Sequence, residues 1–196
     1  MKVRPNSRYA EFASRIRQSS LRPKPWKGVT FRSVELEFAT PEHVLSGQGS
    51  LLFGGRWNAP GLFPVIYSST RPATAVDEAF QLAADFELSP DDIKPRVTCG
   101  IEWALSSVID LTVSGIPSWL ELTVWLKEDF QKINDGGAET LCQAFGRAAR
   151  NSAIVGIFCP SIRVAKGINL VVFLDRLGQK DMMRVLGKEE LVKHLA

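Results

Sequence analysis

Two largely apolar runs near the end of the sequence constrain the fold more than any other feature. They occupy residues 154–159 and 168–174. Each run has the length of a buried β-strand, and both are much shorter than the roughly 20 apolar residues that a membrane-spanning helix needs. The runs therefore predict two sheet strands that close the domain, and no segment of the sequence is expected to cross a membrane.

Weaker periodic patterns add strands and helices before these two runs. Apolar or alternating segments predict strands at residues 28–34, 64–68, 96–103 and 108–111. Helical spacing predicts helices at residues 7–18, 69–86, 118–133 and 138–149. Because the helices are interspersed irregularly among the strands, the pattern favours an α+β fold over a regular strand–helix–strand repeat. At 196 residues the chain has material for one core, so a single domain is expected.

Charge is distributed unevenly along the chain. Residues 1–27 hold eight lysines and arginines and one acid, Glu11, so this segment carries +7 while the whole chain carries +3. We predict a basic N-terminal arm with a short amphipathic helix at residues 1–27, followed by the main domain at residues 28–196. Two interpretations of the arm stay open: a solvated surface helix, which is the commoner case, and an arm that binds phosphate groups or an acidic partner.

Cysteine and histidine usage narrows the chemistry. Cys99, Cys142 and Cys159 are odd in number and widely separated in apolar surroundings, which favours reduced thiols over a disulfide framework. The N-terminal segment lacks the apolar block of a secretory signal, so a cytoplasmic protein is expected. Two histidines and no metal-ligand spacing predict no metal site. Any catalysis must then depend on arginine, tyrosine, serine and carboxylate side chains.

Glu78 is the first residue that needs an explanation. In the predicted helix at residues 69–86 it lies three positions after Ala75, at the edge of the face that the helix buries. A carboxylate taken out of water there needs a partner, such as an arginine or a bound ligand. Two interpretations are about equally open: a glutamate–arginine ion pair that fixes the helix, and a catalytic acid.

A glycine-rich segment at residues 54–61 precedes this helix. It reads Gly-Gly-Arg-Trp-Asn-Ala-Pro-Gly. The glycines allow close approach of the backbone to a ligand, and Arg56 offers a planar set of donors suited to phosphate oxygens. The segment resembles an anion-binding loop, although a structural turn around Trp57 explains the same residues. The two familiar nucleotide-binding loop patterns are absent.

Tyr67, Ser68 and Ser69 lie at the end of a short predicted strand, directly before the helix of Glu78. Consecutive elements would therefore bring an aromatic face, hydroxyl groups and a carboxylate to one region, which favours a site. Tyr67 taken by itself is more often a half-buried core aromatic whose hydroxyl has a partner.

In this order the motifs resemble the RES-domain toxins, a family named for an arginine, a glutamate and a serine. The resemblance extends from about residue 31 to residue 174, and it depends on several motifs at compatible spacings. These motifs are Gly55-Arg56-Trp57-Asn58, Gly61, Tyr67-Ser68-Ser69, residues 72–75 with Glu78, Pro160-Ser161 and Asn169-Leu170-Val171.

The resemblance implies a fold and a function. The fold would be similar to that of ADP-ribosyltransferases: one strand-rich catalytic domain at residues 28–196, with a central NAD cleft and flanking helices. The function would be that of the toxin in a toxin–antitoxin pair, which breaks the bond between nicotinamide and ribose in NAD and so depletes it. NAD is then a substrate, no metal is needed, and the expected partner is an antitoxin protein with an Xre-like DNA-binding domain.

The resemblance also assigns roles to residues. Arg56, Glu78 and Ser161 match the three naming positions, Tyr67 matches the active-site tyrosine of the family, and Arg32 is similar to a first-strand arginine that faces NAD. The residues expected to be catalytic are Glu78, Arg56 and Tyr67. The residues expected to bind NAD are Arg32, Arg56, Tyr67, Ser68, Ser161 and Asn169.

The expected reaction suggests a role for each of these residues. When nicotinamide leaves, the ribose gains positive charge as in glycoside cleavage, so we expect Glu78 to hold the ribose hydroxyls and to stabilise that charge. Arg32 and Arg56 would bind the pyrophosphate, and Tyr67 would stack near the nicotinamide ribose. Ser161 would hydrogen-bond the ligand or position Glu78.

The acceptor of the ADP-ribosyl group stays open at this stage. Inorganic phosphate gives phosphorolysis, water gives hydrolysis, and a protein side chain gives ADP-ribosylation. Enzymes that modify protein arginines often carry an acid or amide two residues before the catalytic glutamate; here that position holds Val76, which favours small acceptors.

Two other functions remain as alternatives. One is an ADP-ribosyltransferase that modifies a specific protein. The other is a non-enzymatic module that binds a partner or nucleic acid through the basic arm. Because stacking aromatics on a basic strand surface are not evident in the sequence, no direct nucleic-acid binding is expected.

Overall fold

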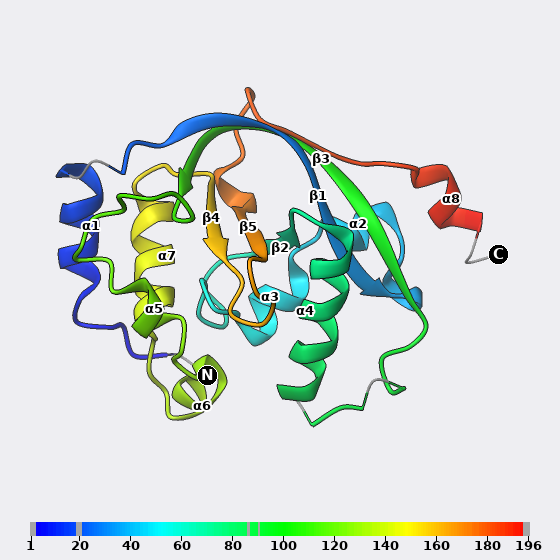
Figure 1. Cartoon of the computed structure of the whole chain (residues 1–196), viewed down its shortest axis with the longest axis horizontal. Helices are drawn as coiled ribbons and strands as arrows, with labels where there is room; N and C mark the ends of the chain where they lie inside the picture. The colour runs from blue at the N-terminus through cyan, green and yellow to red at the C-terminus, as the bar shows by residue number, and fades with distance from the viewer. Residues whose placement is uncertain (1–2, 19–20, 86, 90, 194–196) are drawn as a thin grey trace.

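The computed structural model describes residues 3–193 with the exception of residues 19–20, 86 and 90. Within these residues one sheet is surrounded by helices (Figure 1). The strands are β1 (Lys24–Glu35), β2 (Val65–Ser69), β3 (Arg96–Asp110), β4 (Gly156–Pro160), β5 (Ile168–Phe173) and β6 (Met182–Val185). The helices are α1 (Tyr9–Gln18), α2 (Pro41–Val44), α3 (Gln48–Phe53), α4 (Pro72–Asp85), α5 (Leu122–Trp125), α6 (Phe130–Asp135), α7 (Leu141–Asn151) and α8 (Lys188–Lys193).

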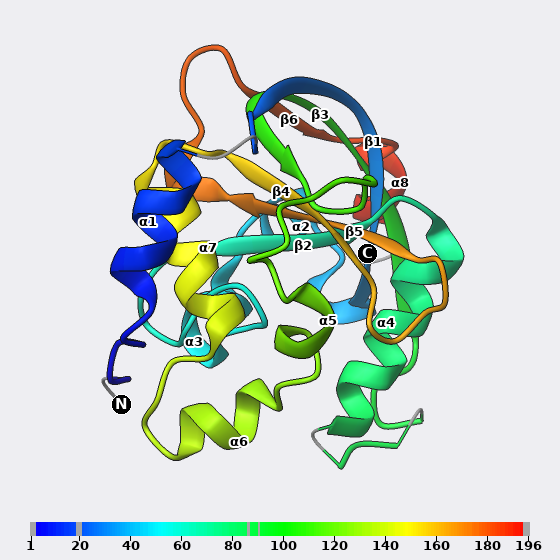
Figure 2. The same cartoon turned by 60° about the vertical axis from the view of Figure 1, so that its left-hand side comes forward.

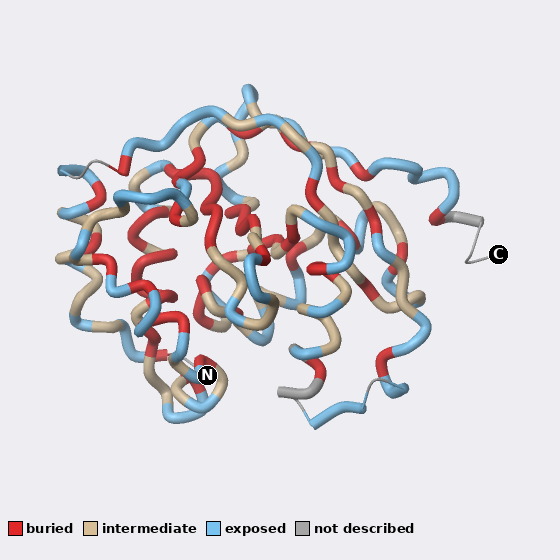
Figure 3. The backbone as a smooth tube through the Cα atoms, viewed as in Figure 1, coloured by how far each residue is buried: buried red, intermediate tan, exposed pale blue. Residues whose placement is uncertain are grey.

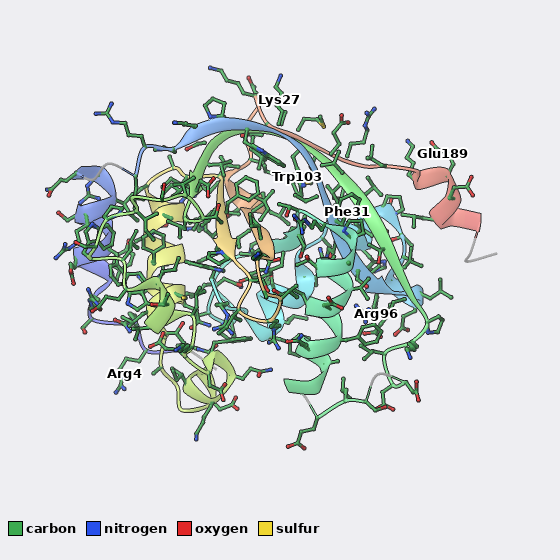
Figure 4. The ribbon with its side chains drawn as sticks, viewed as in Figure 1. Arg4, Lys27, Phe31, Arg96, Trp103 and Glu189 are labelled. Carbon is green, nitrogen blue, oxygen red and sulfur yellow. The ribbon has the colours of Figure 1, made fainter. Side chains whose placement is uncertain are left out.

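The sheet closes on itself. Its strand order is β1-β2-β5-β4-β3-β6, and β1 also pairs with β3 along most of its length. β3 and β4 pair in parallel, whereas β2, β5 and β4 pair antiparallel. β1 meets β2 at one register pair, Phe31 opposite Ser69. Lys27 projects outward from the arch that β1 and β3 form, and Trp103 lies beneath it (Figure 4). The two pairings of β1 therefore turn the sheet into a barrel.

Side chains alternate between two cores along the central strands. In β5, Val171 and Phe173 belong to a first core, which also contains residues of α1 and α7, whereas Leu170 and Val172 belong to a second core. Figure 2 shows α1 beside α7, and Figure 3 shows that α7, β4 and β5 consist largely of buried residues. By the same alternation, Tyr67 faces the first core.

The structure confirms two features predicted from the sequence. The two apolar runs form β4 and β5, which pair with each other, and the chain is a single domain of mixed helices and strands. Cys99, Cys142 and Cys159 are buried and free. None of the helices in the described residues combines the length and apolar character that crossing a membrane requires. The described residues also contain no group of three or more His, Cys, Asp or Glu placed to hold a metal ion.

Several predicted boundaries were wrong. The expected loop at residues 46–61 contains α3, which begins after Gly47 in a left-handed conformation with φ of 59°. Residues 96–103 and 108–111 form the single strand β3, because pairing with β1 continues between them. The helix expected at residues 118–133 is divided into α5 and α6. Phe86, the predicted end of the helix that carries Glu78, lies outside the described residues.

Candidate active site

Glu78 lies on α4 with 22% of its side chain exposed. Its Oε1 accepts a hydrogen bond from Ser161 Oγ at 2.5 Å and another from Asn169 Nδ2 at 2.6 Å. Its Oε2 lies 3.4 Å from Nε of Arg163. The carboxylate is thus held by two neutral donors and faces one cation, and three residues singled out in the sequence, Glu78, Ser161 and Asn169, form one cluster.

The orientation of Ser161 is fixed by its own loop. This residue directly follows β4, and its Oγ accepts the backbone N–H groups of Arg163 at 3.1 Å and Val164 at 2.8 Å. Because both lone pairs of the hydroxyl oxygen are then used, its hydrogen is directed at Glu78.

The orientation of Asn169 is fixed in a similar way by β2. Asn169 lies on β5 opposite Ser69, and its Oδ1 accepts the Ser69 hydroxyl at 2.6 Å. The amide nitrogen of Asn169 must therefore be the atom that faces Glu78. Strand pairing, rather than sequence proximity, brings this donor to the carboxylate.

Arg56 lies in a tight turn in which Gly55 and Asn58 exchange backbone hydrogen bonds. Its Nη1 donates to the carbonyl oxygens of Leu126 at 2.7 Å and Glu128 at 3.0 Å. Its Nε and Nη2 have no hydrogen-bond partner among the residues that the structure describes. The guanidinium is therefore anchored at one edge, and its other nitrogen donors are available.

Tyr67 fixes this turn from the sheet. Its hydroxyl accepts the backbone N–H of Trp57 at 2.9 Å and donates to Asn58 Oδ1 at 2.8 Å. Burial is the main cause that raises the pKa of this hydroxyl. A Cβ atom at Gly55 would lie 2.5 Å from the Tyr67 oxygen, so the turn needs glycine there. The hydroxyl is thus a structural group, and the aromatic ring is the part of Tyr67 that remains for a ligand.

Helix α7 supports the turn from the other side. The fully buried Gln143 donates to the carbonyl of Gly55 at 2.9 Å and exchanges hydrogen bonds with Asn134 at 2.8 and 2.9 Å. A Cβ atom at Gly146 would overlap the carbonyl oxygen of Trp57, so the helix lies directly against the turn. The sequence analysis missed Gln143 and Gly146, and the capping pattern that begins α7 at Thr140 signals the helix but not its contact with the turn.

Cys159 connects the two clusters. It lies on β4 in the first core, and burial is the main cause that raises its pKa to about 12. A hydrogen bond from Trp57 and the charge of Arg56 oppose this shift, and the charge of Glu78 adds to it. Cys159 pairs with Asn169, which binds Glu78, and Tyr67 pairs with Val171 two residues further along β5. Asn169 and Tyr67 therefore lie on the same face of the sheet.

Two residues predicted to bind NAD, Arg32 and Ser68, lie apart from Glu78, Arg56 and Tyr67. Arg32 donates from Nη1 to the carbonyl of Val44 at 2.7 Å, and burial lowers its pKa to about 10. Ser68 is 4% exposed, and its hydroxyl is hydrogen-bonded to Thr30 at 2.7 Å and to the carbonyl of Leu170. These contacts place both side chains with the second core, on the face opposite Tyr67.

Two residues of the Glu78 cluster were not assigned a role from the sequence. Ser69 was noted only as a neighbour of Tyr67, and Arg163 was not singled out at all. The signal for Arg163 was present, because a carboxylate at the edge of a buried face predicts an arginine partner. The sequence could not say which arginine, since Arg163 and Glu78 lie on separate elements.

A hollow with a volume of about 630 Å³ is lined mainly by residues of the segments 21–26 and 108–117. Its lining includes the basic residues Arg22 and Lys24, the ring of Trp26, and Thr70 and Ile168. The Thr70 N–H donates to the Ile168 carbonyl at 2.9 Å, and these two residues directly adjoin Ser69 and Asn169 in the chain. Glu78, Arg56 and Tyr67 are not part of the lining, and Trp26, Phe158 and Ile168 of the lining pack with the second core, so the hollow is separate from the Glu78 cluster.

Comparison with known proteins gives three consistent results. The family model described as RES domain matches residues 12–185. Proteins named NAD(+) phosphorylase MbcT from Mycobacterium bovis and Mycobacterium tuberculosis are each 34% identical over 132 residues, which is 66% of this chain but only 65% of their own length. A crystal structure of the M. tuberculosis MbcT–MbcA toxin–antitoxin complex contains a chain that matches with a TM-score of 0.60 and 25% identity, over 93% of this chain and 95% of that chain.

Proposed function

This chain belongs to the RES-domain family, and from that premise we propose that it is an NAD phosphorylase and the toxin of a toxin–antitoxin pair. It breaks the bond between nicotinamide and ribose with inorganic phosphate as the acceptor. The relatives that carry the name NAD(+) phosphorylase favour phosphate over water and over a protein side chain.

The observation that carries this proposal is the constrained carboxylate of Glu78. Departure of nicotinamide leaves positive charge on the ribose, and a carboxylate held in advance stabilises that charge without rearranging. Ser161 and Asn169 hold Glu78 in this way at 2.5 and 2.6 Å. Glu78 therefore acts as the catalytic carboxylate, and Ser161 and Asn169 position it.

NAD is bound by groups on the same side of the sheet. Arg56 binds the pyrophosphate with the donors that its carbonyl contacts leave over, and the ring of Tyr67 packs near the nicotinamide ribose. Arg32 and Ser68 receive less support from their contacts, because they face the second core. Binding of the pyrophosphate by Arg32 would require the dinucleotide to reach the opposite face of the sheet.

We also propose that the fold is similar to that of ADP-ribosyltransferases, with the NAD cleft centred on Glu78. Residues 28–196 form the catalytic domain, and the basic arm at residues 1–27 contributes Arg22 and Lys24 to the hollow. These cations support the interpretation of the arm as a phosphate-binding segment. Phe12 and Ile16 of α1 belong to the first core, so the arm is packed on the domain.

The partner is an antitoxin. This proposal is supported by the crystal structure of the similar toxin–antitoxin complex. The resemblance to RES-domain toxins favours an antitoxin with an Xre-like DNA-binding domain. We propose that the pair acts in the cytoplasm, which agrees with three buried and free cysteines.

Incubation of the purified protein with NAD, with and without inorganic phosphate, tests the proposal. Chromatography should show phosphate-dependent loss of NAD and equal amounts of nicotinamide and ADP-ribose 1″-phosphate. Loss of NAD at the same rate without phosphate would indicate hydrolysis. No loss of NAD in either condition would contradict the enzymatic function and favour a binding module.

A further inference from the structure

The hollow between the segments 21–26 and 108–117 takes no part in the proposed reaction, because Glu78, Arg56 and Tyr67 are absent from its lining. Its volume of about 630 Å³ lies within the range of about 300–1,000 Å³ that small-molecule sites occupy. The side chains that line it include two cations, an indole ring and a carboxylate. The hollow therefore has the size and the polar groups of a second binding site.

We propose that this hollow binds a nucleoside monophosphate at a site separate from the NAD site. The phosphate binds to Arg22 and Lys24, the base stacks on Trp26, and the ribose hydroxyls bind to Asp110. The inference goes beyond the proposed function and does not depend on NAD cleavage.

Arg22 and Lys24 supply the positive charge for the phosphate. Within the part of the chain that the structure describes, neither side chain forms a salt bridge or a hydrogen bond. Arg22 can donate two parallel hydrogen bonds to phosphate oxygens, and Lys24 adds a point charge. Against these two cations the lining holds one acid, Asp110, so its net charge is positive.

The indole ring of Trp26 is held in one orientation by two neighbours. Phe158 meets it edge-on, with ring centroids 4.9 Å apart and an interplanar angle of 81°. A Cβ atom at Gly28 would lie 2.6 Å from Cζ2 of the indole, so the ring lies over the strand and needs glycine at this position. An aromatic ring fixed in advance can stack on a base with little loss of conformational freedom.

The ladder between β1 and β3 is irregular beside the hollow. Lys24 lies opposite Val108 and Trp26 opposite Leu105, so the register shifts by one residue between the two pairs. Bulges of this kind bend a strand and are common at the rims of barrels and beside binding sites. Lys24, Val108 and Trp26 all line the hollow, which therefore lies at the irregular end of this ladder.

Asp110 supplies an acceptor for the ribose. Its Oδ1 accepts the backbone N–H of Thr112 at 2.8 Å and the Thr112 hydroxyl at 2.6 Å, and its Oδ2 has no hydrogen-bond partner among the described residues. In dinucleotide-binding proteins a carboxylate accepts ribose hydroxyl groups in this way. Because a carboxylate in the same hollow repels a bare phosphate ion, Asp110 favours a ligand that also carries hydroxyl groups.

Calorimetric titration of AMP into the whole chain tests the site. We expect saturable binding to the wild type and at least about 10-fold weaker binding to R22Q/K24Q, because the phosphate loses both cations. The matched control is K27Q/K180Q, which also removes two exposed cations but leaves the lining unchanged. Its affinity for AMP should equal that of the wild type.

Adenosine, which lacks the phosphate, shows which part of the ligand the cations bind. The wild type should bind AMP at least about 10-fold more tightly than adenosine, whereas R22Q/K24Q should bind the two about equally. D110A should weaken the binding of both ligands, because both carry the ribose hydroxyls.

Three outcomes would overturn the proposal. The first is the absence of saturable AMP binding, and the second is equal affinity for AMP in the wild type and R22Q/K24Q. The third is competition with NAD: we expect AMP to change the KM for NAD by less than about 2-fold, as for independent sites. A rise of this KM in proportion to the AMP concentration would place AMP in the NAD site. A protein that binds AMP as expected but consumes no NAD would contradict the proposed function alone.

Discussion

The two sides of the proposed site differ in burial and in the contacts that hold them. On one side, Glu78 is a partly exposed carboxylate held by the side chains of Ser161 and Asn169. On the other side, the turn of Arg56 is fixed by the buried hydroxyl of Tyr67 and the buried amide of Gln143, which bond largely to the backbone. The first side presents a reactive group, and the second provides a rigid platform.

Because the two sides are held differently, activity and stability depend on different residues of one site. A partly exposed carboxylate can exchange partners with water or a ligand at small cost. A buried polar group that loses its partner costs about 1–3 kcal/mol. Substitutions on the Glu78 side should therefore change activity at nearly constant stability, whereas substitutions on the platform should lower stability first.

The largest effect on activity is expected for E78Q. Glutamine keeps the size of the side chain and removes its charge, so kcat should fall about 10²–10³-fold, as for other losses of transition-state stabilisation. The thermal midpoint should stay within a few degrees of the wild type. Rates of NAD loss and a melting curve measure both quantities. Retention of more than half of the activity would contradict the role of Glu78, and a large loss of stability would break the comparison.

The largest effect on stability is expected for G146A. The added methyl group would overlap the Trp57 carbonyl oxygen, so α7 or the turn must shift, at a cost of about 1–3 kcal/mol. G49A is the matched control, because Gly49 lies in α3 and no atom lies within 4 Å of an added Cβ. It should stabilise the protein by about 0.5–1 kcal/mol. Urea unfolding compares the two variants, and equal effects would show that α7 does not clamp the turn.

A loss of the same order is expected for Y67F. Removal of the hydroxyl leaves the Trp57 N–H and Asn58 Oδ1 without this partner, which costs about 1–3 kcal/mol. The ring remains, so NAD cleavage well below the melting temperature should fall much less than in E78Q. Activity reduced to the level of E78Q at wild-type stability would show that the hydroxyl takes part in the reaction.

The smallest expected effect is on how stability changes with pH, and it depends on Cys159, which lies between the two sides. Burial raises the pKa of Cys159 from 9.0 to about 12, so the folded thiol keeps its proton at pH 10 while the unfolded thiol loses it. The stability contribution is complete below pH 9 and decreases above it, by roughly 1 kcal/mol at pH 10. C159A should lose less stability than the wild type between pH 8 and pH 10 in urea unfolding. Identical losses would mean that the thiol is not buried as the structure has it.

The fold could be predicted where local pattern decides it. The apolar runs that became β4 and β5 are buried on both faces, so their composition alone identifies them. The single strand β3 could not be recognised, because its middle section is held by pairing with β1 rather than by its own pattern. For the same reason β6, an edge strand that pairs with β3 alone, carried no signal strong enough to predict it.

The site could be predicted in part. The position of Glu78 on its helix predicted that the carboxylate needs a partner, and Ser161, Asn169 and Arg163 are found around it. Arg32 and Ser68 were grouped with these residues by the resemblance. Strand alternation then turned both toward the second core, and the sequence does not reveal which face of a strand carries the site.

By itself, the sequence determined the two buried strands and the helix that carries Glu78, because composition and periodicity over a few residues identify them. The tertiary structure alone decided which groups meet: Gln143 reaches Gly55 across 88 positions, and Ser161 reaches Glu78 across 83. Such contacts depend on how the sheet closes and on which face each side chain points to. These are properties of the whole chain, and no local pattern encodes them.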